Sequence, residues 1–149
     1  TDMLIIETPI IFTESYEELV DPVGILKTIK DVGAFKAGTR GAETIPEIKR
    51  FGDRIKCVPG KRGLNAFSNT DLEMVLAAQG IKEVILAGTV TSICIDSTGR
   101  AAHERDLKVT VLSDCTASRT NFEQGFYCEN VFPLYARTCT ADEFIAELA

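Results

Sequence analysis

The sequence alternates short β-rich runs with amphipathic segments, and this alternation constrains the fold more than any other feature. Runs rich in apolar and β-branched residues, typical of strands, occupy residues 3–7, 54–58, 83–88 and 108–113, with a weaker one at 134–138. Helical patterns occupy residues 21–33, 69–80, 92–105 and 140–148. Such alternation predicts a mostly parallel sheet covered by helices on both faces, an α/β fold with three layers, α/β/α.

Two of these helical segments begin with a capping-box pattern. Thr70 is followed three residues later by Glu73, and Thr140 is followed by Glu143. In such a pair each side chain accepts a hydrogen bond from the other residue's backbone N–H. The pattern predicts helix starts at both threonines.

Length and composition limit the classes of partner. The chain has 149 residues, 45% of them hydrophobic, without repeats or linkers, which predicts a single domain over residues 1–149. A net charge of −6 and no long basic run predict that it binds neither nucleic acid nor an anionic membrane. We expect a small-molecule or protein partner.

The sequence also carries no sign of export or of membrane insertion. No run approaches the roughly 18 apolar residues of a membrane span, and residues 1–20 lack a signal-peptide pattern. The cysteines are odd in number, widely spaced and without a CxxC pair, which predicts reduced thiols in a cytoplasmic protein. They are Cys57, Cys94, Cys115, Cys128 and Cys139.

Cys94 follows the strand predicted at residues 83–88, where strand-to-helix loops gather in a parallel sheet. With Thr91 as the N-cap, Cys94 lies in the first helical turn, whose unpaired N–H groups favour a thiolate and can stabilise an oxyanion. The alternative is a small buried thiol that packs in the core. Local sequence alone does not separate the two interpretations.

A nucleophilic cysteine needs a base, and the one histidine does not qualify. His103 lies nine residues after Cys94 on the same predicted helix, roughly 13 Å along it, and is interpreted as a surface residue. The base must then be a carboxylate or a lysine. Lys61, in the segment 57–72 beside Leu64 and Phe67, is a candidate, although "PGKRG" is also typical of a turn with solvated cations.

Residues 60–118 resemble the isochorismatase-like hydrolases, the cysteine hydrolase superfamily, element by element. They combine a lysine motif, a strand, a Gly-x-x-Thr-x-x-Cys elbow ending at Cys94, a helix and a further strand. The flanking segments also fit, so that the resemblance extends over nearly the whole chain.

The resemblance implies an Asp–Lys–Cys triad in which Cys94 attacks an amide or ureido carbonyl and Lys61 supports the developing charge. It also implies a cis peptide bond between Thr89 and Val90, which aims the N–H of Val90, beside that of Cys94, at the oxyanion. The implied function is hydrolysis of a C–N bond in a small molecule.

Which residue is the third member of the triad, the acid, depends on how the N-terminal segment is aligned with the family. Under one alignment "LIIETPIIF" is the family's first strand, and Glu7 replaces the catalytic Asp. Under the preferred alignment the same segment is the family's second strand, and residues 3–7 are expected to pair with residues 54–58 and not with residues 83–88. The family's strand order, 3-2-1-4-5-6, then loses its central first strand, and the catalytic Asp and the N-terminal strand and helix are missing from these residues.

Metal use and cofactors follow from the resemblance as well. Nicotinamidases of this superfamily add an Asp/His/His metal site, and a chain with one histidine offers no such ligands. We therefore expect no metal and no other cofactor, and nicotinamide is disfavoured as a substrate.

Three further expectations remain open. The chain could be a catalytically impaired remnant that acts in assembly, or a flavodoxin-like redox module, although no Gly-rich phosphate loop follows residues 3–7. A homo-oligomer is expected because residues 126–136 carry more aromatic surface than one connection needs; alternatively, Phe126, Phe132 and Tyr135 pack inside the domain.

Overall fold

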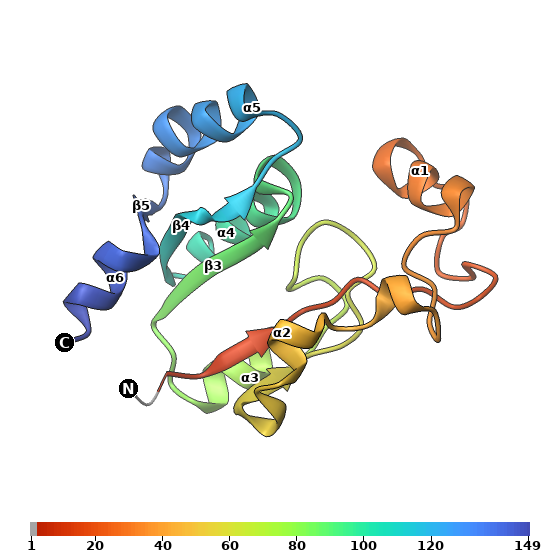
Figure 1. The fold of residues 1–149 in the computed structure, drawn as a ribbon, viewed down its shortest axis with the longest axis horizontal. Coiled ribbons are helices and arrows are strands. Elements are labelled where there is room, and N and C mark those ends of the chain that lie inside the picture. Colours follow the sequence, from red (N-terminus) through yellow and green to blue (C-terminus); the bar gives the residue numbers. More distant parts are fainter. Residues whose placement is uncertain (1–2) are drawn as a thin grey trace. The chain divides into compact units, whose positions relative to one another are not determined.

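The computed structural model describes residues 3–149, in which the chain divides into two compact units (Figure 1). The N-terminal unit consists of residues 3–63 and Ser68–Leu72, and the C-terminal unit consists of Leu64–Phe67 and Glu73–Ala149. All strand pairs in both units are parallel, as the alternation of strands and helices predicted. Among the described residues, no helix is both long and apolar enough to cross a membrane.

The N-terminal unit is built on two short parallel strands, with residue 5 opposite residue 55 and residue 7 opposite residue 57. The pairing of the segments 3–7 and 54–58, expected under the preferred alignment, is confirmed. The elements of this unit are β1 (Ile5–Glu7), α1 (Gly24–Val32), α2 (Pro46–Lys49) and β2 (Ile55–Cys57).

A small apolar cluster holds the N-terminal unit together. Phe12, Tyr16, Leu19 and Ile29 are buried against one another, and the rings of Phe12 and Tyr16 lie 5.7 Å apart. The Tyr16 hydroxyl donates a hydrogen bond of 2.7 Å to the carbonyl of Ala34. The helix predicted at residues 21–33 therefore packs its apolar face on the segment that follows β1.

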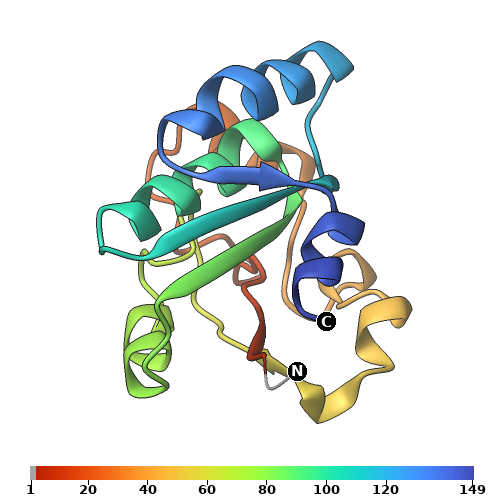
Figure 2. The same cartoon turned by 90° about the vertical axis from the view of Figure 1, so that its left-hand side faces the viewer.

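The C-terminal unit is a three-stranded parallel sheet in the order β3-β4-β5, seen in Figure 2. Both α4 and α6 contact β4, the central strand. The elements are α3 (Leu72–Ala78), β3 (Glu83–Thr89), η3 (Thr91–Ile95), α4 (Asp96–His103), β4 (Lys108–Ala117), α5 (Asn121–Phe126), η4 (Tyr127–Val131), η5 (Phe132–Leu134), β5 (Arg137–Cys139) and α6 (Ala141–Glu147).

The core of the C-terminal unit lies around β4. Val111 and Ala102 are fully buried, and Phe132 is 0% exposed. Phe126, by contrast, is 48% exposed, and Tyr135 is partly buried. The aromatic segment 126–136 is thus divided between packing inside the unit and an exposed surface.

The predicted helix caps differ in outcome. Thr140 forms the complete capping box with Glu143 at the start of α6. Helix α3 begins at Leu72, later than the pattern predicted. The backbone N–H of Leu72 donates a hydrogen bond to the Thr70 hydroxyl. Glu73 also forms an ion pair with Arg105 at 2.8 Å, a long-range contact that a local pattern does not contain.

Candidate active site

Cys94 lies in a π-helical turn that links the end of β3 to α4. The turn spans Thr91–Ile95, and the carbonyl of Val90 accepts hydrogen bonds from the N–H groups of Ile93 at 3.0 Å and Ile95 at 3.2 Å. The peptide bond between Thr89 and Val90 is cis, at the position that the resemblance implied. Cys94 is partly buried in this turn. π-helical turns occur frequently at functional sites.

The expectation that Thr91 caps this helix is wrong. The residue before the turn is Val90, and no side chain forms a cap there. Thr91 is 0% exposed, and its hydroxyl donates a hydrogen bond of 2.6 Å to Oε1 of Gln124 on α5. The side chain is turned away from the helix end because α5, remote in sequence, offers it a buried acceptor.

A second link joins the same turn to α5. The Ser92 hydroxyl donates to Glu123 at 2.6 Å, and the Arg119 guanidinium donates to the same carboxylate at 2.8 Å. The guanidinium of Arg119 and then the hydroxyl of Ser92 stabilise the ionised form and hold the pKa of Glu123 at about 2. Two adjacent residues of the Cys94 turn are therefore bonded to two adjacent residues of α5.

Sequence reasoning missed Glu123 and Gln124. A signal was present: Thr120 and Glu123 have the spacing of a helix cap, and the Thr120 hydroxyl accepts the N–H of Glu123 at 3.1 Å. That cap places residues 123 and 124 in the first turn of a helix that follows β4. The carboxyl ends of neighbouring parallel strands meet at one edge of a sheet, so this spacing could have placed the helix start near the Cys94 turn.

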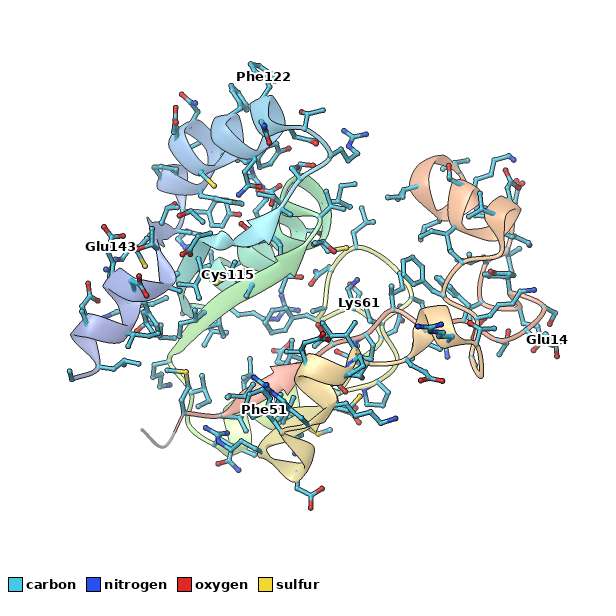
Figure 3. The ribbon with its side chains drawn as sticks, viewed as in Figure 1. Glu14, Phe51, Lys61, Cys115, Phe122 and Glu143 are labelled. Atoms are coloured by element: carbon cyan, nitrogen blue, oxygen red, sulfur yellow. The ribbon has the colours of Figure 1, made fainter. Side chains whose placement is uncertain are left out.

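Lys61 is a buried cation in the loop that follows β2 (Figure 3). It is 4% exposed, and its Nζ donates a hydrogen bond of 2.8 Å to the carbonyl of Gly63. Its neighbour Arg62 is exposed. The interpretation of "PGKRG" as a turn with two solvated cations is therefore wrong for Lys61, because the loop folds its side chain inward.

Glu7 ends β1 in the N-terminal unit, opposite Cys57 of β2. Its carboxylate accepts hydrogen bonds from the Thr44 hydroxyl, at 3.1 Å to Oε2 and 3.3 Å to Oε1. Burial raises the pKa of the Cys57 thiol, and the Glu7 carboxylate raises it further. Cys94 lies in the turn of the C-terminal unit that Val90 directly precedes, whereas Lys61 and Glu7 belong to the N-terminal unit.

The remaining cysteines and the histidine are less suited to catalysis. His103 is exposed at the end of α4, with its ring 6.1 Å from that of Tyr135, which confirms it as a surface residue. Within residues 3–149, no cluster of three or more His, Cys, Asp or Glu side chains could hold a metal ion. All five cysteines are free, and desolvation raises the pKa of the thiols of Cys57, Cys115, Cys128 and Cys139.

Comparison with known proteins identifies relatives over most of the chain. The chain is 30% identical over 108 residues to the uncharacterized isochorismatase family protein YwoC of Bacillus subtilis, an alignment that covers 72% of this chain and 56% of YwoC. The chain therefore spans little more than half of that relative's length.

Solved structures with similar folds also cover nearly all of this chain. An isochorismatase-like hydrolase from Alkaliphilus metalliredigens superposes with a TM-score of 0.83 at 28% identity, covering 99% of this chain and 75% of that one. N-carbamoylsarcosine amidase from Thermoplasma acidophilum superposes with a TM-score of 0.74 at 25% identity, covering 95% and 74%.

A family model that matches nearly the whole sequence shows to which family the chain belongs. The model of the isochorismatase domain matches residues 5–143, which include both paired strands of the N-terminal unit and the sheet and Cys94 turn of the C-terminal unit. With this match, the parallel α/β fold and the similarity to solved relatives, the chain belongs to the isochorismatase family.

Proposed function

We propose that the protein hydrolyses a C–N bond, in an amide or ureido group of a small molecule, through a covalent intermediate on Cys94. The observation that carries this proposal is the place of Cys94, partly buried in the turn that follows the carboxyl end of β3. In an open parallel sheet this edge is where ligands bind. The similarity to N-carbamoylsarcosine amidase supports a carbamoyl or amide carbon as the electrophile.

The proposed reaction has two steps. The Cys94 thiolate attacks the carbonyl carbon, a C–S bond forms, and the N–H groups of Val90 and Cys94 stabilise the oxyanion. The tetrahedral intermediate collapses, the C–N bond breaks, and the nitrogen leaves as an amine or ammonia after taking a proton. Water then attacks the thioester carbon, which releases the acid and restores the thiol.

Lys61 is proposed to stabilise the negative charge on sulfur and on the substrate oxygen. Its burial supports this role, because a cation in a low-dielectric environment acts more strongly on nearby charge than one in water. Arg62, the adjacent exposed cation, is the matched control.

Glu7 is proposed not to be the acid that shuttles the proton. The hydrogen bonds from Thr44 and the pairing of β1 with β2 support this choice, because Glu7 then occupies the second strand of the family's order. Glu7→Gln is expected to change turnover by less than about threefold. A loss of about a hundredfold, as expected for a displaced proton-transfer group, would identify Glu7 as the acid.

The decisive experiment measures hydrolysis by the full-length protein. Ammonia release is followed with N-carbamoylsarcosine, other N-carbamoyl amino acids, simple amides and nicotinamide, the last as the disfavoured substrate. Cys94→Ala is expected to abolish turnover, and Lys61→Ala to reduce it at least several hundredfold, as for loss of a charge-stabilising group. Arg62→Ala is expected to stay within about twofold of wild type.

Each result decides between the candidate functions. Turnover that survives Cys94→Ala would refute the covalent mechanism, and a Lys61→Ala rate equal to that of Arg62→Ala would return Lys61 to a structural role. If none of these compounds is hydrolysed and Cys94 reacts with iodoacetamide no faster than the other thiols, the chain is a non-catalytic member of the family.

A further inference from the structure

A partly buried hydrogen-bond network joins the Cys94 turn to α5 and β4. The Thr91 hydroxyl bonds to Oε1 of Gln124, and Nε2 of Gln124 lies 3.0 Å from the carbonyl of Ser113 and 3.1 Å from Oγ1 of Thr116. Thr91 and Thr116 are both buried. The Gln124 side chain therefore connects the first residue of the turn to the carboxyl half of β4.

The chemistry of the network fixes its orientation. A backbone carbonyl only accepts hydrogen bonds, so the group that faces Ser113 must be the amide NH₂ of Gln124. The amide oxygen then faces Thr91, whose hydroxyl must be the donor. A carboxylate at position 124 would place an oxygen against the Ser113 carbonyl, and an apolar side chain would remove the acceptor that the Thr91 hydroxyl uses. Position 124 thus requires a primary amide.

The network acts on the reacting end of the turn. Thr91 directly follows Val90 and lies three residues before Cys94, so a shift of Thr91 moves both N–H groups assigned to the oxyanion. The Ser92–Glu123 bond holds the next residue of the turn to α5 as well. Two adjacent residues of α5, Glu123 and Gln124, make one link each, and the Gln124 link ends on Thr91, which is 0% exposed.

We infer that Gln124 is a positioning residue for Cys94: through Thr91 it fixes the place of the nucleophile and of the oxyanion N–H groups relative to the end of β4. This inference rests on the proposed function. It assigns Gln124 no contact with the substrate, and it predicts an effect on the chemical step greater than the effect on substrate binding.

Three variants of the full-length protein test the inference. Thr91→Val removes the donor without changing the shape of the side chain, Gln124→Met removes the hydrogen bonds of the amide at similar side-chain length, and Thr91→Ser restores the hydroxyl. Thr110→Val is the matched control: Thr110 is equally buried in the same unit, but its hydroxyl bonds to Glu83, at the start of β3. All four variants are compared by melting temperature, so that lost stability is separated from lost reactivity.

Two measurements report on the reactivity of Cys94 and not only on folding. The first is the alkylation rate of Cys94 by iodoacetamide between pH 5 and 9, measured by peptide mass spectrometry, which needs no substrate. The second is kcat and KM for N-carbamoylsarcosine, or for whichever compound of the panel is hydrolysed. Because misplacement on the order of 1 Å can cost about a hundredfold in rate, Thr91→Val and Gln124→Met are each expected to lower kcat about tenfold or more. KM should change less than about twofold, and Thr91→Ser should recover most of the rate.

The inference also requires that the effects of the Thr91 and Gln124 substitutions be coupled. Since Thr91 and Gln124 act through one hydrogen bond, the double variant should be no slower than the slower single variant. The inference is overturned if both single variants melt lower than wild type but keep Cys94 alkylation and kcat within about twofold of wild type. Independent, additive losses would overturn it too.

Failure of the proposed function has a separate signature. If Cys94→Ala retains turnover, Cys94 is not the nucleophile, and kcat no longer reports on its position. The alkylation rates of the Thr91 and Gln124 variants still show whether the network controls the thiol, and equal rates in all variants reject the positioning role.

Discussion

Gly60 is expected to be the most sensitive backbone position of the Lys61 loop. Its φ is +100°, and a Cβ built there lies 2.5 Å from the carbonyl oxygen of Asn69. Gly63, in the same loop, has neither constraint, because a Cβ there meets nothing within 4 Å. The pair of substitutions Gly60→Ala and Gly63→Ala therefore separates the special geometry of one glycine from the general effect of losing a glycine.

The magnitude follows from two costs at Gly60. A non-glycine residue at positive φ costs roughly 1–3 kcal/mol. The contact with the Asn69 carbonyl involves backbone atoms, so relieving it requires the two segments to separate, which adds about 1–3 kcal/mol as for overpacking. We expect Gly60→Ala to lower the free energy of unfolding by about 2–6 kcal/mol. Gly63→Ala should change it by no more than about 1 kcal/mol.

Urea unfolding of both variants, followed by circular dichroism, measures the difference. Because Lys61 follows Gly60 directly, Gly60→Ala should also reduce turnover more than Gly63→Ala under conditions in which both proteins are folded. Equal unfolding midpoints for the two variants would refute the reasoning, because they would show that neither the positive φ nor the close approach to Asn69 constrains the loop.

Three further predictions concern thiol reactivity, acid stability and association. Limiting iodoacetamide at neutral pH should label Cys94 first, since the pKa of each other thiol is raised; preferential labelling of another cysteine would contradict this. The folded-state pKa of Glu123 lies below its ordinary value, so its ionised form stabilises the fold above about pH 4.5 and this contribution is lost as the pH falls towards 2. The stability difference between wild type and Glu123→Gln should therefore shrink between pH 5 and 2.5 in urea unfolding. Phe122 lies on α5 (Figure 3), is 82% exposed and stacks on the ring of Phe126, so it should contribute to a homo-oligomer. Phe122→Ser should shift sedimentation towards the monomer, and a wild-type protein that is monomeric at micromolar concentration would rule this out.

The fold class and the strand pairs were accessible from the sequence because both depend on local patterns. The period of the apolar residues separates strands from helices, and a chain that alternates the two has few alternatives to parallel pairing. The place of Cys94 was likewise predictable from its motif, because a residue that follows a strand in such a sheet lies at the carboxyl edge of the sheet. The Thr140 cap was predictable for the same reason: both of its partners lie within four residues.

Only the tertiary structure decided how side chains remote in sequence are used. Thr91 has the sequence of a helix cap, yet its hydroxyl donates a hydrogen bond to Gln124, 33 residues away. Because Thr91 is buried, its hydroxyl cannot bond to water, and the Gln124 amide supplies the acceptor. Lys61 has the sequence of a solvated turn and is buried, whereas Arg62 beside it is exposed. Local sequence specifies which conformations a segment can adopt; which hydrogen-bond partners it finds depends on segments that only folding brings to the same place.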